Sequence, residues 1–263
     1  MENLSELLLM AERLARAAGD LLATRPDVFD LNEKSSAVDF ATQMDIAAEK
    51  LIVDSIIASR PDDAIIGEEG SDRPGTSGIT WVIDPLDGTV NYFYGIPGWN
   101  VSVAAKDATG VLVGAVYSPT TDSFWSAAKG MGATFNGKKI ACNNPVELEM
   151  ALLATGFAYD RGARSYQASL VTSLLPRIRD FRRNGAAAVD LCYVAMGALR
   201  GSHESIAFIR NVLAAFIPAA IVGVLFKSKI DGLLENPVVV CFALIVGGIA
   251  VSLQRPAVQK VPG

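Results

Sequence analysis

Residues 83–89 read Ile83-Asp84-Pro85-Leu86-Asp87-Gly88-Thr89, and they follow a strand-like run, ITWV. A helix is expected to begin near Thr89, which makes this segment a strand-to-helix turn. Such a turn presents carboxylates at the end of a strand beside the unpaired N–H groups of a helix start. Asp84 and Asp87 are therefore candidate ligands of divalent cations, and Gly88 lets the backbone approach an anion closely. The segment indicates phosphoryl-transfer chemistry.

A third carboxylate lies upstream, where Gly67-Glu68-Glu69-Gly70 ends another strand-like run. Oxygen ligands without nearby His or Cys favour Mg²⁺ over Zn²⁺. Taken alone, Asp-Pro-x-Asp-Gly is typical of a surface turn and Glu-Glu of a solvated loop. The two motifs together, each at the end of a strand, favour a magnesium site.

The composition narrows the class of protein. The chain has 263 residues, of which 51% are hydrophobic and 19% charged, so it is too apolar for a disordered protein. Its net charge of −5 provides no basic surface for nucleic acid, and we expect no nucleic-acid partner. The cysteines Cys142, Cys192 and Cys241 are far apart and His203 is the only histidine, which excludes a zinc ribbon and a histidine-rich metal site. Carboxylates must therefore bind any metal.

Periodicity predicts an α/β fold before residue 205. Apolar residues at helical spacing predict helices over 3–24, 42–60, 163–178 and 185–199. Short apolar or alternating runs predict strands within 63–69, 79–84, 100–106, 110–118, 123–129 and 149–155. Asn136-Gly137 predicts a two-residue hairpin turn, because a type I′ turn needs two positive φ angles.

The C-terminal part differs in character. Residues 212–226 and 237–253 contain no charged side chain, and flanking apolar residues extend each run to about the 20 residues that span a bilayer. From residue 206 onward the net charge is +3, against −8 for residues 1–205. We therefore predict a transmembrane helical hairpin over 206–254, followed by a tail over 255–263. A pair of buried helices in a soluble core is the alternative.

The run Trp81-Val82-Ile83-Asp84-Pro85-Leu86-Asp87-Gly88-Thr89-Val90-Asn91-Tyr92 resembles the signature of the inositol monophosphatase family. The resemblance covers residues 1 to about 204, including Lys34 with Asp39 and Asp45, and the segment from Arg183 to Cys192. It implies a layered αβαβα inositol monophosphatase/fructose-bisphosphatase-like fold, a Mg²⁺-dependent phosphatase, a cytoplasmic catalytic domain over 1–204 and a homodimer. Apart from this resemblance, the pattern of Lys34, Asp39 and Asp45 is equally consistent with a functional site and with a solvated loop.

The resemblance also implies roles for individual residues. Glu68, Asp84 and the Leu86 carbonyl are implied as ligands of one Mg²⁺, and Asp84 and Asp87 of a second. The backbone amides of Gly88 and Thr89 would bind the phosphate. A water on the first ion, oriented by Glu68 and the Thr89 hydroxyl, would attack phosphorus, and Asp45 would steady Thr89. The residues expected to contact the substrate are Gly88, Thr89, Gly185, Ala186, Asp190 and Glu204.

The resemblance ends after Glu204. The family continues to a Trp-Asp motif whose aspartate completes the second metal site, whereas this chain has Asn211 at about that position. A neutral amide is a poor substitute for an anionic ligand. We therefore expect a C-terminally truncated phosphatase fold, weak binding of the second metal, and impaired activity.

Residues from 206 to about 254 resemble a pair of transmembrane helices from the undecaprenyl-diphosphate phosphatase family, although that family's catalytic motifs are absent. Two hypotheses follow. The first is Mg²⁺-dependent hydrolysis of a small phosphate monoester, inositol monophosphate above all, by a catalytic domain that the hairpin anchors to a membrane. The alternative is a membrane-embedded fragment of an undecaprenyl-diphosphate phosphatase, or a non-catalytic chimera. Relatives of the first scaffold also act on fructose 1,6-bisphosphate, histidinol phosphate and 3′-phosphoadenosine nucleotides.

Overall fold

The structure is a computed structural model that describes residues 3–36, 39–143 and 147–199. All of these belong to one of the two units into which the chain divides, Met1–His203. The predicted hairpin over 206–254 and the tail over 255–263 lie outside the described residues, as do Glu204 and Asn211. No helix in the described part is long and apolar enough to cross a bilayer.

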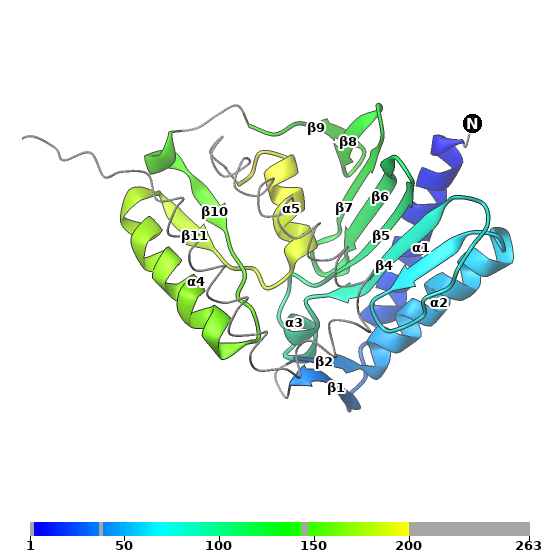
Figure 1. Cartoon of the computed structure of the whole chain (residues 1–263), viewed down its shortest axis with the longest axis horizontal. Coiled ribbons are helices and arrows are strands. Elements are labelled where there is room, and N and C mark those ends of the chain that lie inside the picture. The colour runs from blue at the N-terminus through cyan, green and yellow to red at the C-terminus, as the bar shows by residue number, and fades with distance from the viewer. Residues whose placement is uncertain (1–2, 37–38, 144–146, 200–263) are drawn as a thin grey trace, which may run out of the picture. The chain divides into compact units, whose positions relative to one another are not determined.

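A seven-stranded sheet forms the centre of the described unit (Figure 1). Its order along the sheet is β3 (Ala64–Gly67), β4 (Thr80–Asp87), β5 (Asn100–Asp107), β6 (Gly110–Ser118), β7 (Ser123–Ala128), β8 (Gly132–Phe135) and β9 (Lys138–Ile140). Only the β3/β4 pair is parallel; the other neighbours are antiparallel. Each strand predicted between residues 63 and 129 is present.

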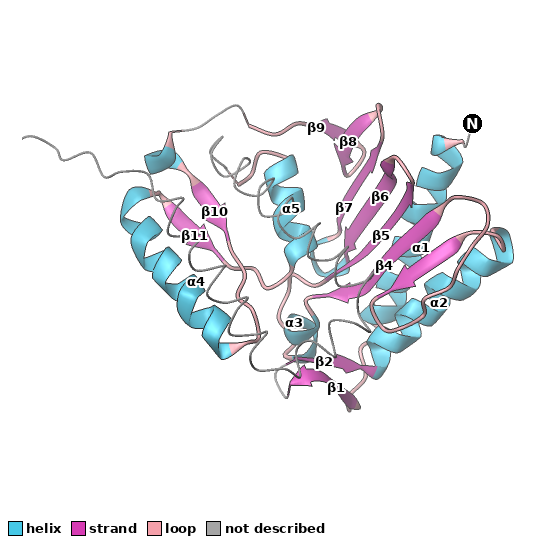
Figure 2. Ribbon diagram, in the orientation of Figure 1, coloured by secondary structure: helices cyan, strands magenta, loops and turns pink. Residues whose placement is uncertain are grey.

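Two helices, α1 (Leu4–Ala23) and α2 (Gln43–Ser59), cover one face of this sheet (Figure 2). Alternate residues of β5, namely Val101, Val103 and Ala105, are fully buried in the core on this side. A strand places successive side chains on opposite faces, so their neighbours Ser102 and Ala104 face the other way, where a cavity of about 210 Å³ lies.

The opposite face carries α5 (Ala187–Ala195), whose Tyr193 ring packs edge-on against Trp125 of β7 at 5.8 Å. Beyond α5 lie the parallel pair β10 (Leu152–Ala154) and β11 (Asp180–Arg182) and then α4 (Arg161–Leu174) (Figure 1). In the described part the order of layers is therefore helix, sheet, helix, sheet, helix. This arrangement agrees with the predicted αβαβα fold class.

Several predicted boundaries are corrected. The predicted helix over 163–178 begins at Arg161, because Asp160 accepts a hydrogen bond from the Ala163 amide, and it gives way to a 3-10 turn at Leu175–Arg177, which contains Pro176. The helix predicted over 185–199 spans only Ala187–Ala195, and the strand predicted over 149–155 only Leu152–Ala154. Further 3-10 turns lie at Pro119–Thr121 and Leu148–Met150.

The two tight connections differ in how well the sequence predicted them. Asn136 and Gly137 both have positive φ, 47° and 75°, as the predicted β8–β9 turn requires. The antiparallel pair β1 (Leu31–Ser36) and β2 (Asp39–Thr42), by contrast, was not predicted. Its residues are mostly polar and lack a clean alternation, so the pattern did not distinguish this pair from a loop.

Candidate active site

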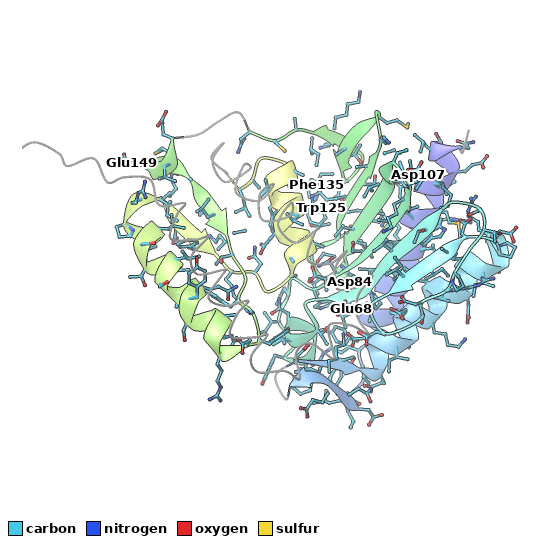
Figure 3. The ribbon with its side chains drawn as sticks, viewed as in Figure 1. Glu68, Asp84, Asp107, Trp125, Phe135 and Glu149 are labelled. Carbon is cyan, nitrogen blue, oxygen red and sulfur yellow. The ribbon has the colours of Figure 1, made fainter. Side chains whose placement is uncertain are left out.

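The site begins with the register of two parallel strands. Gly67 is opposite Ile83 at the end of the β3/β4 ladder, so the next residues, Glu68 just after β3 and Asp84 within β4, lie side by side where the parallel pairing ends. The two side chains are close enough for the charge of Glu68 to act on Asp84. Figure 3 shows both at the end of the sheet nearest α3 (Thr89–Phe93).

A bulge in β4 brings Asp87 to the same place. Asp84 is opposite Ser102 and Asp87 is opposite Asn100, so β4 has one residue more than β5 over this interval. In a regular strand, side chains three residues apart face opposite sides of the sheet, and the extra residue removes this difference. The two aspartates can therefore act on one site despite their odd spacing.

Asp84 and Asp87 are largely buried, whereas the Glu68 side chain is 47% exposed, and the three negative charges repel one another. Burial, together with the charges of Glu68 and Asp87, raises the pKa of Asp84 to about 9. The pKa of Asp87 is raised as well, chiefly by burial. Such a cluster is stabilised by a cation, and its ligands would all be oxygen atoms, which suits Mg²⁺.

Asp87 also connects the sheet to α5. Its Oδ1 accepts the Ala187 amide at 3.1 Å, and its Oδ2 accepts the Ala188 amide at 2.7 Å. Asn100 Nδ2 donates to Oδ2 as well, at 2.9 Å. Because Ala186 offers no side-chain cap at the start of α5, Asp87 performs this function from another part of the chain.

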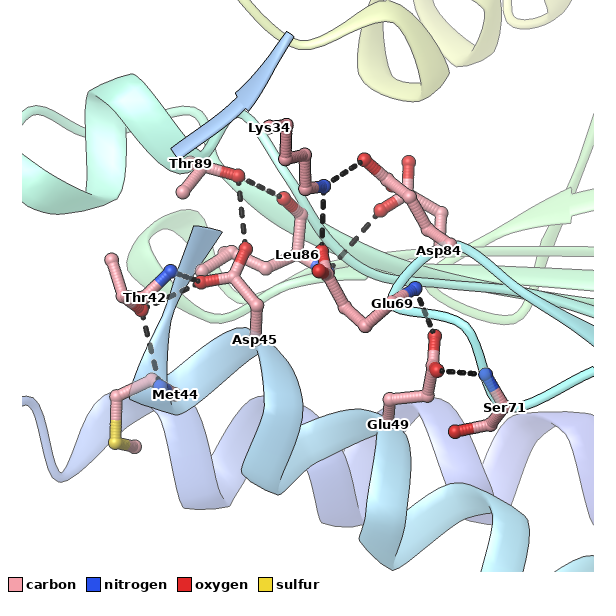
Figure 4. Close-up of polar contacts among 11 residues, drawn as sticks. Lys34, Thr42, Met44, Asp45, Glu49, Glu69, Ser71, Asp84, Leu86 and Thr89 are labelled. Carbon is pink, nitrogen blue, oxygen red and sulfur yellow. Dashed lines mark hydrogen bonds and ion pairs between the residues drawn. The ribbon is translucent and has the colours of Figure 1, made fainter. Parts of the chain in front are cut away.

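Thr89 and Asp45 form the second side of the site (Figure 4). The Thr89 hydroxyl lies 3.0 Å from Asp45 Oδ1 and 3.0 Å from the Leu86 carbonyl oxygen. Asp45 in turn accepts the Thr42 amide and hydroxyl at 2.7 and 2.6 Å, as the capping box of α2. Burial raises the pKa of Asp45, although the bonds from Thr42 and Thr89 act against this. Thr89 is thus held by a buried carboxyl group.

A lysine supplies positive charge beside the carboxylates. Lys34 Nζ lies 2.8 Å from Glu68 Oε1 and 2.7 Å from Glu69 Oε1. These carboxylates raise the pKa of Lys34, although its burial acts in the opposite direction. Asp39, which begins β2, belongs to the neighbouring hairpin.

The predicted phosphate and substrate residues lie next to one another. Gly88, at φ 90°, precedes α3, and a Cβ on it would come within 3.2 Å of the Ala186 Cβ and 3.4 Å of the Gly185 carbonyl oxygen. Asp190, on α5, accepts a hydrogen bond from Asn184 in the same loop. Burial raises the pKa of Asp190.

The carboxylates fit a cation in chemistry and charge, but their side chains do not converge on one point. Within 3–36, 39–143 and 147–199, no three Asp, Glu, His or Cys side chains have the spacing of a formed metal site. Glu68 points to Lys34, and Asp87 to Asn100 and the α5 amides. Binding a metal would therefore require side-chain rotation, with the backbone positions already in place.

Two buried residues at the site were missed in the sequence. Glu49 is 1% exposed and Asn100 is fully buried, and both hold parts of the site. A signal existed for Glu49, because it lies one helical turn after Asp45 on the buried face of α2. No comparable signal marked Asn100, since an amide at the start of a strand is common.

The described residues form a layered α/β fold with an acidic site beside a strand-to-helix turn. Residues 3–214 match the inositol monophosphatase family. The chain is 39% identical to the inositol-1-monophosphatase SuhB of Mycobacterium tuberculosis, over 74% of each chain. It is 39% identical to the Nus factor SuhB of Escherichia coli K12, over 75% of this chain and 76% of that one.

Solved structures show the same fold. The Mycobacterium tuberculosis SuhB structure matches with a TM-score of 0.65 at 39% identity, over 76% of this chain and 77% of that one. The extragenic suppressor protein SuhB of Bartonella henselae matches with a TM-score of 0.67 at 29% identity, over 74% and 75%. The chain belongs to the inositol monophosphatase family, a family of phosphoric monoester hydrolases.

A second family matches the C-terminal part. Residues 173–261 are similar to bacitracin resistance protein BacA, an undecaprenyl-diphosphate phosphatase. The two matches overlap over 173–214, a range that includes the predicted boundary near residue 205. The fusion suspected from the sequence is therefore confirmed at the level of family similarity.

Proposed function

We propose that this chain hydrolyses a small phosphate monoester, with inositol monophosphate as its preferred substrate, and that it requires Mg²⁺. The observation that carries the proposal is the adjacency of Glu68 and Asp84 where the parallel β3/β4 pairing ends, with Asp87 brought to the same side of the sheet by the bulge. The same strand end leads directly into Gly88 and α3. An acidic cluster beside a turn that can receive an anion suits phosphoryl transfer.

The acidic residues would bind the metal ion. Glu68, Asp84, Asp87 and the Leu86 carbonyl would hold Mg²⁺, which when bound supplies the positive charge that activates water and neutralises the phosphate. Glu68 would accept a hydrogen bond from the attacking water.

The Thr89 hydroxyl would act on the same water. It donates its single proton to Asp45 or to Leu86, so its lone pairs remain available to accept a hydrogen bond from that water. Asp45 and the Leu86 carbonyl together orient the hydroxyl, and the backbone amides of Gly88 and Thr89 would bind the phosphate.

The α5 side would bind the alcohol part of the substrate. Gly185 and Ala186 pack against Gly88, so a group bound here would be adjacent to the phosphate. The Asp190 carboxylate, held by Asn184, is available to accept hydrogen bonds from sugar-like hydroxyls. Glu204 is assigned to the same substrate contact from the family resemblance.

We further propose that activity is impaired. The neutral Asn211 stands in for the aspartate that completes the second metal site in the family, so the second Mg²⁺ should bind weakly. We also propose a cytoplasmic catalytic domain, membrane association through residues 206–254, and a homodimer by resemblance to the family.

The test is phosphate release by the purified whole chain in detergent. We expect Mg²⁺-dependent release from inositol 1-phosphate, with a higher kcat/KM than for fructose 1,6-bisphosphate, histidinol phosphate or a 3′-phosphoadenosine nucleotide. Asp84→Asn should lower the rate by about a hundredfold or more. Absence of Mg²⁺-dependent release from every substrate would overturn the proposal.

The match to BacA over residues 173–261 favours a second candidate function, that of a membrane-embedded fragment or non-catalytic chimera. It predicts that the chain partitions into detergent micelles or vesicles and releases no phosphate in the assay above. Vesicle flotation together with that assay separates the two candidates, because a membrane-anchored phosphatase would give both flotation and phosphate release.

A further inference from the structure

Glu49 is a buried acidic residue that the proposed mechanism does not use. It lies on α2 and is 1% exposed. Its Oε2 accepts the Glu69 amide at 2.9 Å, and its Oε1 accepts the Ser71 amide at 3.1 Å (Figure 4). One side chain therefore holds the backbone immediately after Glu68.

Gly67, the residue before Glu68, packs closely against the Glu49 carboxylate. A Cβ on Gly67 would lie 2.6 Å from the Glu49 carboxylate carbon and 2.7 Å from each of its oxygens. The Gly67 amide donates to Asp72 Oδ1 at 3.1 Å. The backbone thus passes directly over the Glu49 carboxylate, and only a residue without a side chain fits at position 67.

These contacts fix the backbone on both sides of Glu68. Gly67 is fixed by the β3/β4 pairing and by its closeness to Glu49, while the amides of Glu69 and Ser71 are fixed by Glu49 itself. Hydrogen bonds to a buried carboxylate are among the stronger ones in proteins. The Glu68 backbone therefore has little freedom, while its side chain is 47% exposed and contacts Lys34.

We propose that Glu49 is a positioning residue for the metal site: it sets the backbone at 67–71 so that the Glu68 carboxylate can reach a cation shared with Asp84. This inference rests on the proposed function and adds a residue that touches neither metal nor substrate. This positioning depends on both carboxylate oxygens of Glu49, since each accepts a hydrogen bond from a different backbone amide.

The first test is Glu49→Gln in the whole chain. The glutamine has the same shape but only one oxygen, so one of the two amides must face an NH₂ group and lose its acceptor. In metal-free protein we expect the Glu69 and Ser71 amides to exchange with solvent about tenfold faster or more. By calorimetric titration, Mn²⁺ should bind about tenfold more weakly. Lys50→Gln, on the next and exposed residue of α2, is the matched control and should change neither quantity.

The second test approaches the contact from the other side. Gly67→Ala places a methyl group against the Glu49 carboxylate and should weaken Mn²⁺ binding to a similar degree. In the Glu49→Ala background the carboxylate is gone, so adding Gly67→Ala should have little further effect. This non-additivity would not arise if the two residues influenced stability independently.

The outcomes separate the two proposals. Wild-type protein that binds no Mn²⁺ would contradict the proposed function. Wild-type protein that binds Mn²⁺, together with a folded Glu49→Gln variant that binds it equally and exchanges Glu69 and Ser71 normally, would overturn the role of Glu49. Should Glu49→Gln fail to fold, additive effects of Gly67→Ala and Glu49→Ala on Mn²⁺ binding would overturn it instead.

Discussion

Asp87 Oδ2 lies 2.7 Å from the backbone nitrogen of Ala188, 101 residues further along the chain. Through this bond a carboxylate at the end of β4 caps the helix that carries Asp190, one of the proposed substrate-contacting residues. The same oxygen accepts Asn100 Nδ2. The proposed metal side and substrate side of the site are therefore linked by one residue.

Asp87→Ala should accordingly loosen α5 as well as weaken Mg²⁺ binding. Loss of a helix cap costs about 1 kcal/mol. No local side chain can take over the capping of α5, because the residue at its N-cap position is Ala186. Amide exchange of Ala187 and Ala188, measured without metal, should accelerate. Asp190→Ala, a substitution on α5 that leaves the cap intact, is the control; equal exchange in both variants would contradict the capping role.

Thr89 should need its hydroxyl and not merely its shape. Thr89→Val removes the group that contacts Asp45 and Leu86 and should lower kcat by about a hundredfold, with KM little changed. Thr89→Ser keeps the hydroxyl and should retain most of the activity. Steady-state kinetics on inositol 1-phosphate will show this, and a Thr89→Val enzyme with wild-type kcat would exclude a catalytic hydroxyl.

Asp63 should make the fold sensitive to acid. Burial alone would raise its pKa, but hydrogen bonds from Arg60, Ser77 and Trp81 outweigh burial and lower the pKa below the ordinary 3.8. A lowered folded-state pKa gives stability that is present above pH 3.8 and is lost as the pH falls through the folded value. Urea unfolding between pH 6 and 3 should show this loss.

In Asp63→Asn the corresponding part of the pH dependence should be absent. The variant should also be less stable at pH 6, by about 2 kcal/mol, because a charged acceptor is removed from three donors. If the free energy of unfolding of this variant falls as steeply between pH 6 and 3 as that of the wild type, other carboxylates cause the acid sensitivity.

The cysteines should differ in reactivity. Cys142 is exposed, whereas burial, with a smaller effect of Asp87, raises the pKa of Cys192 to about 12. Because the thiolate is the reactive form, iodoacetamide should modify Cys142 at least about tenfold faster at pH 8. Peptide mass spectrometry in a Cys241→Ser background measures this directly, and equal rates would show that the packing of α5 against the sheet does not shield Cys192.

Local pattern predicted most of the sheet, because its strands are short apolar or alternating runs separated by Gly, Pro or Asp. It could not predict features that depend on tertiary context. The bulge that brings Asp87 to the same side of the sheet as Asp84 is visible only in the pairing with β5, and the β1–β2 pair is too polar to show a strand period. The placement of Glu49 beneath Gly67 depends on two segments that are distant in sequence.

The candidate site was predicted largely through family resemblance, which supplied roles that spacing alone could not. The structure brings Glu68, Asp84, Asp87, Thr89 and Asp45 into one region. Lys34, which the pattern alone left equally open to a solvated loop, contacts Glu68 and Glu69 directly. Glu204 and Asn211 lie outside the described residues, so their roles stay predictions.

Binding of Mn²⁺ to the whole chain, followed by electron paramagnetic resonance, is the most direct test of the acidic site. We predict that the wild-type chain binds Mn²⁺, and that Glu68→Gln and Asp84→Asn each weaken this binding about tenfold or more. Glu33→Gln, on exposed β1, should leave it unchanged. Equal binding by the wild-type chain and all three variants, or no binding by any of them, would contradict the account.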